Sequence, residues 1–213
     1  MLDIITLLVT PFQQNCRILA AREQRTALVV DPGGDVRLIL DKLKGEGLSC
    51  SEIWLTHAHL DHCGGVAELK AATGATLLGH EIERDMRAMV QQQSVMFGLP
   101  PGAMDNCPEP DRYIADGDTC QFGGVDFEVL FTPGHSPGHV CFYAASMGTL
   151  LAGDTVFSGS IGRTDLPGGD HASLLASIKE KIMTLPDDTL ILSGHGPDTT
   201  VGVERGSNPF LQG

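Results

Sequence analysis

Most of the histidines of this chain lie in three short motifs that contain groups able to bind metal ions. The densest motif is residues 57–62, His-Ala-His-Leu-Asp-His; the other two surround His135 and His195, with Asp154 between them. Neutral imidazoles and carboxylates are ligands of divalent metals. Four candidate ligands within residues 57–62 cannot all reach one ion, so the pattern favours two ions that share a water molecule. Such a pair lowers the pKa of that water and polarises a carbonyl group, which is the chemistry of a hydrolase.

The elements expected around the first motif divide its ligands into two sets. Residues 52–55 favour a strand and residues 63–69 the start of a helix, so the ligands fall in the turn between them. Residues two apart on an extended segment face the same way. His57 and His59 can therefore bind one ion, while Asp61-His62, past the bend, faces another.

The later ligand candidates also follow predicted strands. All candidates are thus expected at carboxyl ends of strands, where they can converge on one rim. One histidine at a strand end is usually an ordinary surface or core residue, and only the three motifs together make a metal site the better interpretation. The strands and the residues that follow them are 126–131 with His135, 149–153 with Asp154, and 189–193 with His195.

Strands and helices are expected in both halves of the chain. In the first long helix, Asp35 is the expected N-cap and Gly45 the expected stop. Between the halves, residues 81–111 are less regular and fit either a solvent-facing connection with its methionines on the core or a flap over the site. The other expected elements are strands at 4–9, 16–20, 27–30 and within 119–153, and a helix ended by Pro186 in which Leu174, Ile178 and Ile182 share a face.

Length, composition and charge bound the class of protein. With 213 residues, 42% of them hydrophobic, the chain 1–213 is expected to fold as one domain with a two-sheet core. A net charge of −13 argues against binding nucleic acid, which requires a basic groove. The first residues lack a basic segment and no long apolar span follows, so we expect a cytoplasmic protein that does not enter membranes. The six scattered cysteines are expected as reduced core residues, with Cys63 as the one candidate for contact with the site.

These motifs resemble the metallo-β-lactamase superfamily, and within it the hydroxyacylglutathione hydrolases (type II glyoxalases), especially their short bacterial single-domain members. The resemblance extends from Asn15-Cys16 and residues 30–34 (Val-Asp-Pro-Gly-Gly) to residues 204–210 (Glu-Arg-Gly-Ser-Asn-Pro-Phe). It implies an α/β fold, the αββα sandwich, with the metal site at one edge of the two sheets. The C-terminal helical domain with which longer members bind glutathione is expected to be absent.

The resemblance also implies a role for each ligand candidate. Two divalent ions are implied, zinc first, although iron and manganese also suit imidazole and carboxylate ligands. Asp61 and Asp154 are the candidate catalytic carboxylates, while Asp31 and His139 could orient ligand histidines or serve the turns in which they lie. The implied ligands are His57, His59 and His135 for the first ion, Asp61, His62 and His195 for the second, and Asp154 as the bridge.

The reaction implied by this resemblance is hydrolysis of S-2-hydroxyacylglutathione, such as S-lactoylglutathione, to glutathione and a 2-hydroxy acid. Arg163 and Arg205 are the candidate substrate-binding residues. Arg163 preserves the cation that in longer members is a lysine for the glutathione carboxylate, but Asp165 replaces the tyrosine two residues on. A salt bridge of Arg163 with Asp165 or Asp170 that braces the loop is the alternative.

Two other activities stay open, together with the acyl group and the oligomeric state. Persulfide dioxygenases share this fold and the Gly-Arg-Thr-Asp sequence, but hold a single Fe(II) on two histidines and an aspartate, here His57, His135 and Asp154. Another metallohydrolase activity, such as that of a lactonase, is the second alternative. Three residues differ from the dioxygenase pattern and favour the hydrolase: Leu60, His139 and Gly196.

Overall fold

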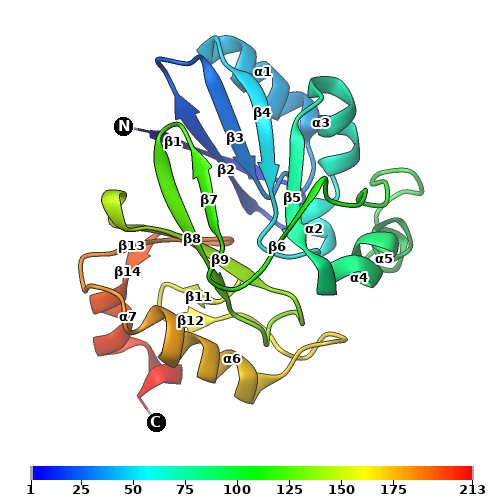
Figure 1. The fold of residues 1–213 in the computed structure, drawn as a ribbon. Helices are drawn as coiled ribbons and strands as arrows, with labels where there is room; N and C mark the ends of the chain where they lie inside the picture. The colour runs from blue at the N-terminus through cyan, green and yellow to red at the C-terminus, as the bar shows by residue number, and fades with distance from the viewer. Residues whose placement is uncertain (1, 213) are drawn as a thin grey trace. The chain divides into compact units, whose positions relative to one another are not determined.

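The computed structural model of this protein describes residues 2–212, which form two compact units. The N-terminal unit extends to Ile114 and includes Phe122–Gly124, and the C-terminal unit comprises Ala115–Gln121 and the residues from Val125 onward. Two six-stranded sheets form the framework, one for each unit (Figure 1). In the described part of the chain, no helix combines the length and the apolar character needed to cross a membrane.

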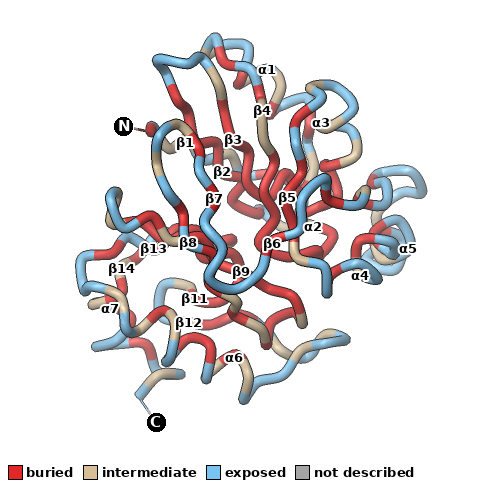
Figure 2. Tube along the Cα trace, in the orientation of Figure 1, coloured by how far each residue is buried: buried red, intermediate tan, exposed pale blue. Residues whose placement is uncertain are grey.

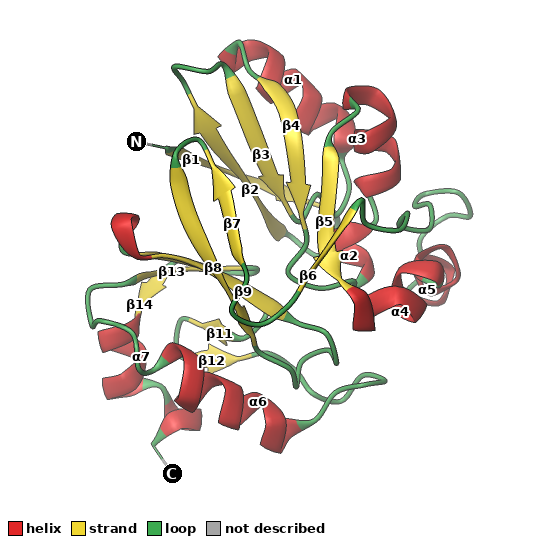
Figure 3. Ribbon diagram, viewed as in Figure 1, coloured by secondary structure: helices red, strands yellow, loops and turns green. Residues whose placement is uncertain are grey.

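The sheet of the N-terminal unit is mixed, with its strands in chain order from β1 to β6. The β1–β2 and β2–β3 pairs are antiparallel, and the following three pairs are parallel. Parallel neighbours need crossover connections, which α1 and α3 provide while they cover one face of the sheet (Figure 3). Strand β2 is buried along its whole length (Figure 2). The bounds are β1 Asp3–Val9, β2 Gln14–Ala21, β3 Thr26–Val30, α1 Val36–Glu46, β4 Ser49–Trp54, α2 Leu60–Cys63, α3 Val66–Thr73, β5 Thr76–His80, η1 Glu81–Glu83, α4 Arg84–Ala88, α5 Val90–Met96 and β6 Arg112–Ile114.

The sheet of the C-terminal unit has the order β14-β13-β10-β9-β8-β7, and β10 and β13 are parallel neighbours in it. A small hairpin, β11–β12, follows β10. Leu174, Ile178 and Ile182 are fully buried on α6 and the π-helical turn after it, which confirms the shared apolar face. The bounds are β7 Thr119–Phe122, β8 Val125–Phe131, β9 Val140–Ala144, η2 Ala145–Met147, β10 Thr149–Gly153, β11 Val156–Phe157, β12 Ser160–Ile161, α6 His171–Ser177, η3 Ile178–Ile182, β13 Leu190–Ser193, β14 Thr199–Thr200, α7 Val201–Ser207 and η4 Pro209–Leu211.

Two local expectations about the N-terminal unit are wrong, and a third, the N-cap, is confirmed only in part. Helix α1 continues through Gly45 and ends at Gly47, whose left-handed backbone (φ 69°) places its N–H on the last carbonyls of the helix. Asp35 occupies the N-cap position, but its carboxylate accepts the N–H of Thr10 at 2.7 Å instead of capping α1. Asp61-His62 lies in the helical turn α2 rather than in an open turn, since helix formation begins earlier than the glycines suggested.

Residues 81–111 are more regular than expected, because most of their first half is helical in η1, α4 and α5. Met86 and Met104 pack on the core of the N-terminal unit, whereas Met96 is 76% exposed. The connection with methionines on the core is therefore confirmed in part, and the flap stays a prediction. All six cysteines are buried thiols, as expected for core residues.

Candidate metal centre

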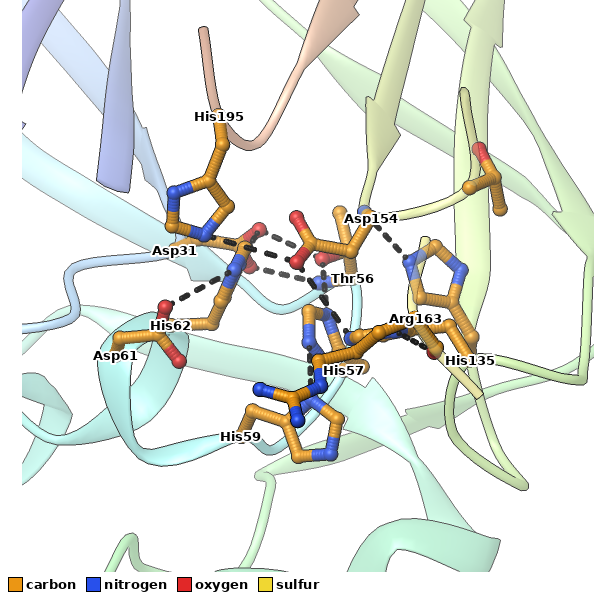
Figure 4. Close-up of polar contacts among 12 residues, drawn as sticks. Asp31, Thr56, His57, His59, Asp61, His62, His135, Asp154, Arg163 and His195 are labelled. Atoms are coloured by element: carbon orange, nitrogen blue, oxygen red, sulfur yellow. Dashed lines mark hydrogen bonds and ion pairs between the residues drawn. The ribbon is translucent and has the colours of Figure 1, made fainter. Parts of the chain in front are cut away.

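The N-terminal unit collects the four ligand candidates of the first motif in one loop between β4 and the end of α2 (Figure 4). The side chains of His57 and His62 are almost completely buried, and His59 is 9% exposed. The Nε2 atom of His57 lies 3.0 Å from Nδ1 of His59, and Nε2 of His62 lies 3.9 Å from a carboxylate oxygen of Asp61. The loop therefore places His59 beside His57 and Asp61 beside His62, and their division between two ions stays a prediction.

A buried carboxylate, Asp31, fixes the histidines of this loop. It accepts the N–H of Thr56 at 2.8 Å, the hydroxyl of Thr56 at 2.6 Å and Nδ1–H of His62 at 2.9 Å. Because the Thr56 hydroxyl donates its proton to Asp31, it accepts from Nδ1–H of His57 at 3.0 Å. Both rings then carry their lone pair on Nε2, the tautomer of a metal ligand held by an outer carboxylate. The expected orienting role of Asp31 is confirmed.

The turn after Asp31 packs against the backbone of α2. Asp31 itself has a left-handed backbone (φ 52°), which turns the chain directly after β3. A Cβ on Gly33 would lie 1.5 Å from the carbonyl oxygen of Asp61, so only glycine permits this approach. The backbone of Asp31 thus forms the turn, while its carboxylate orients the histidines, so Asp31 has both of the roles considered for it.

The C-terminal unit brings together His135, Asp154 and His195, which follow three different strands. Because β10 and β13 are parallel neighbours with Gly153 opposite Ser193, Asp154 and His195 leave adjacent strand ends. One oxygen of Asp154 lies 3.5 Å from Nε2 of His135 and 3.6 Å from Nε2 of His195 (Figure 4). Two donors on one tetrahedral zinc ion stand about 3.4 Å apart. Asp154 is therefore spaced to share one ion with each imidazole, which fits a bridging carboxylate.

Two further contacts orient these ligand candidates. Nδ1–H of His135 donates to the carbonyl oxygen of Arg163 at 2.7 Å, which leaves the lone pair on the Nε2 that faces Asp154. Nε2 of His139 accepts the backbone N–H of Asp154 at 3.1 Å, while its Nδ1 contacts the hydroxyl of Thr132 at 2.9 Å. His139 therefore positions the backbone of Asp154, whereas it was expected to orient a ligand histidine.

Both candidate substrate-binding arginines form ion pairs. Arg163 makes a two-pronged contact with Asp165, at 2.7 and 2.8 Å, and this contact lowers the pKa of Asp165 to about 2. Both side chains are more than half exposed, so the pair lies in solvent. Arg205 bonds to Asp187 and to the carbonyl oxygens that follow η3, those of Met183 and Leu185. Their assignment to substrate binding stays a prediction.

Cys63 is a core residue rather than a candidate ligand. The pKa of this thiol is raised well above its ordinary value, mainly because the side chain is buried and secondly because of its hydrogen bond with Cys107. Its side chain is fully buried in the hydrophobic core cluster of the N-terminal unit.

Sequence reasoning missed Glu83, which is 2% exposed and accepts the backbone N–H of Ala58 at 2.9 Å. Its partner lies 25 residues earlier, and Glu83 sits in a run of charged residues that is typical of a solvated helix face. Only the pairing of β4 with β5 brings the two segments together.

The comparisons with known proteins identify the family. The family model of the metallo-beta-lactamase superfamily matches residues 9–195. The chain belongs to this superfamily. It is 38% identical, over 95% of both chains, to the hydroxyacylglutathione hydrolase GloC of Haemophilus influenzae.

Solved structures confirm the expected fold class. The structure of the BLEG-1 B3 metallo-beta-lactamase matches 99% of this chain with a TM-score of 0.91 and 38% identity, and all of that chain is covered. The structure of TTHA1623 in a di-iron-bound form matches 97% of this chain with a TM-score of 0.88 and 37% identity, again over that whole chain. That residues 1–213 fold as a single domain stays a prediction.

Proposed function

We propose that this metallo-hydrolase superfamily member is a thioesterase that cleaves S-2-hydroxyacylglutathione, such as S-lactoylglutathione, into glutathione and a 2-hydroxy acid. The observation that carries the proposal is the 38% identity with a hydroxyacylglutathione hydrolase over 95% of each chain. The proposed substrate is a small molecule, without a role for nucleic acid or a membrane.

The donor set fits two divalent ions. We assign Asp154 as the bridge, because one of its two carboxylate oxygens lies within 3.6 Å of Nε2 of both His135 and His195. These two histidines follow different strands. Zinc is the first choice, and iron must be measured because a 37% identical structure is described as di-iron-bound. The proposed ligands are His57, His59 and His135 for one ion and Asp61, His62 and His195 for the other.

When bound, two such ions lower the pKa of a water molecule and polarise the thioester carbonyl. The residues of the chain supply the geometry around that chemistry. Asp31 keeps the lone pairs of His57 and His62 on Nε2, and the Arg163 carbonyl does the same for His135. A thiolate leaves readily without protonation, so the reaction needs no general acid side chain. This suits a site in which Asp31 and the Arg163 carbonyl already hydrogen-bond to the side chains of the proposed metal ligands or of their neighbours.

Two competing activities have specific observations to weigh. The 38% identity with the BLEG-1 structure favours β-lactam hydrolysis as the second candidate. A persulfide dioxygenase would need only His57, His135 and Asp154. In this structure the buried Asp31 also orients His62 by a direct hydrogen bond, in addition to His57, which it reaches through Thr56. This support of His62 favours two ions over one iron.

A substrate panel tests the proposal. Purified protein would be assayed with S-lactoylglutathione, with a chromogenic cephalosporin, and with glutathione persulfide in an oxygen electrode. We expect release of glutathione from S-lactoylglutathione to be the fastest reaction by far. Faster cephalosporin turnover would establish a lactamase, and oxygen consumption without thioester hydrolysis would establish a dioxygenase.

A further inference from the structure

We propose that Glu83 is a positioning residue for the first metal ion. Its carboxylate oxygen accepts the N–H of Ala58 at 2.9 Å, and Ala58 is the residue between the ligand candidates His57 and His59. Both Glu83 and Ala58 are buried, at 2% and 0% exposure. The inference rests on the proposed metal site and extends it to a residue 25 positions away.

The local structure directs the Glu83 side chain toward the loop that carries His57 and His59. Glu83 is the last residue of η1, which continues directly into α4, and its side chain makes no capping bond to α4. Its carboxylate reaches the backbone N–H of Ala58, 25 residues earlier in the chain.

Helix α4, which follows Glu83 directly, is itself anchored and gives Glu83 a rigid support. Arg87, 1% exposed, donates to the carbonyl oxygen of His80 at 2.8 Å and to Glu109 at 2.9 Å. The carbonyl oxygen of Arg87 accepts the N–H of Cys107 at 3.0 Å. The helix is thereby tied to the end of β5 and to the segment that leads into β6, so Glu83 has little freedom to move.

The contact acts on backbone geometry. His57 is held through its Nδ1 by Thr56, which receives support from Asp31, while the peptide that follows His57 is held by Glu83. Fixing that peptide sets the direction in which His59 leaves the chain. Residues that support metal ligands in this way contribute roughly 10- to 100-fold to metal affinity.

The test is a zinc titration of the metal-depleted full chain in competition with a chromophoric chelator. We expect Glu83→Ala to lower the affinity for one zinc ion by roughly 10- to 100-fold. The affinity for the other zinc ion should stay within a few-fold of its original value. Glu83→Gln retains an oxygen that can accept the Ala58 N–H, so it should bind zinc within a few-fold of the unmodified protein. Glu81→Gln, an exposed glutamate of the same turn, is the matched control and should change nothing.

Unchanged zinc affinity in Glu83→Ala would overturn the proposal, as would a Glu83→Gln protein no better than Glu83→Ala. If Glu83→Ala fails to fold, Glu83→Asp replaces it, since the shorter side chain keeps the charge but does not reach Ala58. The proposal then requires the Gln variant to bind zinc more tightly than the Asp variant. A protein that binds two zinc ions but does not hydrolyse thioesters would refute the proposed function and leave this inference intact.

Discussion

The two units supply their ligand candidates in different ways. The N-terminal unit presents four within residues 57–62, on one loop, whereas the C-terminal unit presents three from the ends of β8, β10 and β13. In the first, buried carboxylates hold side chains and a peptide through Asp31 and Glu83. In the second, the register of β10 with β13 places Asp154 and His195, and the carbonyl oxygen of Arg163 holds His135.

The difference teaches where each half-site is vulnerable. The loop of the N-terminal unit depends on a few charge-assisted hydrogen bonds, which are stronger than neutral ones and costly to remove. The strand ends of the C-terminal unit are held by many ladder bonds, so their geometry should tolerate loss of a single support. Removal of a shared ligand should be severe in either case.

The largest expected effect is that of Asp154→Ala. Asp154 lies between two imidazoles, so its removal should uncouple both proposed ions. Loss of several kcal/mol of charge stabilisation corresponds to a decrease in kcat on the order of a thousandfold or more. Hydrolysis of S-lactoylglutathione measures it, with circular dichroism to show that the fold survives. Near-normal turnover with two ions still bound would exclude the bridging role.

Asp31→Asn should have the next largest effect. An amide cannot accept from Thr56 and His62 at both of its polar atoms, so His57 and His62 should lose their fixed tautomers together. We expect both ions to bind roughly 10- to 100-fold more weakly in a chelator competition. Asp35→Asn, in the same turn, is the control, because its carboxylate holds only the N–H of Thr10. Weakening of one ion alone would contradict the shared support.

Arg163→Ala should separate substrate binding from ligand support. The carbonyl that holds His135 belongs to the backbone and survives the substitution. If the guanidinium binds the glutathione carboxylate, KM for S-lactoylglutathione should rise about tenfold or more. A small thioester without that carboxylate serves as the control and should react as before. Parallel loss with both substrates would instead assign Arg163 to bracing the loop through Asp165.

His139→Gln should have the smallest effect and completes the comparison with Asp31. His139 accepts the backbone N–H of Asp154, and the neighbouring strand ends also fix that residue. Loss of one neutral hydrogen bond corresponds to about a twofold to tenfold decrease in kcat/KM. Steady-state kinetics with S-lactoylglutathione measure this change. A loss as large as that of Asp31→Asn would show that both half-sites depend equally on single supports.

The sequence predicted what is encoded locally. The strands before His135, Asp154 and His195 were located because apolar runs end at those positions, and Leu174, Ile178 and Ile182 share a face through helical spacing alone. The metallo-β-lactamase fold followed from the motifs rather than from the elements, and the solved structures confirm it.

What the sequence did not predict depends on distant contacts. The sequence around Glu83 is typical of a solvated helix. The pairing of β5 with β4 brings its carboxylate within hydrogen-bond distance of the Ala58 N–H. Asp35 fits an N-cap, but the N–H of Thr10 competes for its carboxylate. Gly45 was the expected stop of α1, but the helix continues to Glu46 and the left-handed backbone at Gly47 ends it.

Stepwise metal addition to the metal-depleted protein, with S-lactoylglutathione hydrolysis followed at each step, tests the dinuclear thioesterase most directly. The seven proposed ligands predict that activity rises until about two metal equivalents per chain are bound and then stays constant. One tightly bound iron, with oxygen consumption on glutathione persulfide and without thioester hydrolysis at any metal content, would contradict it.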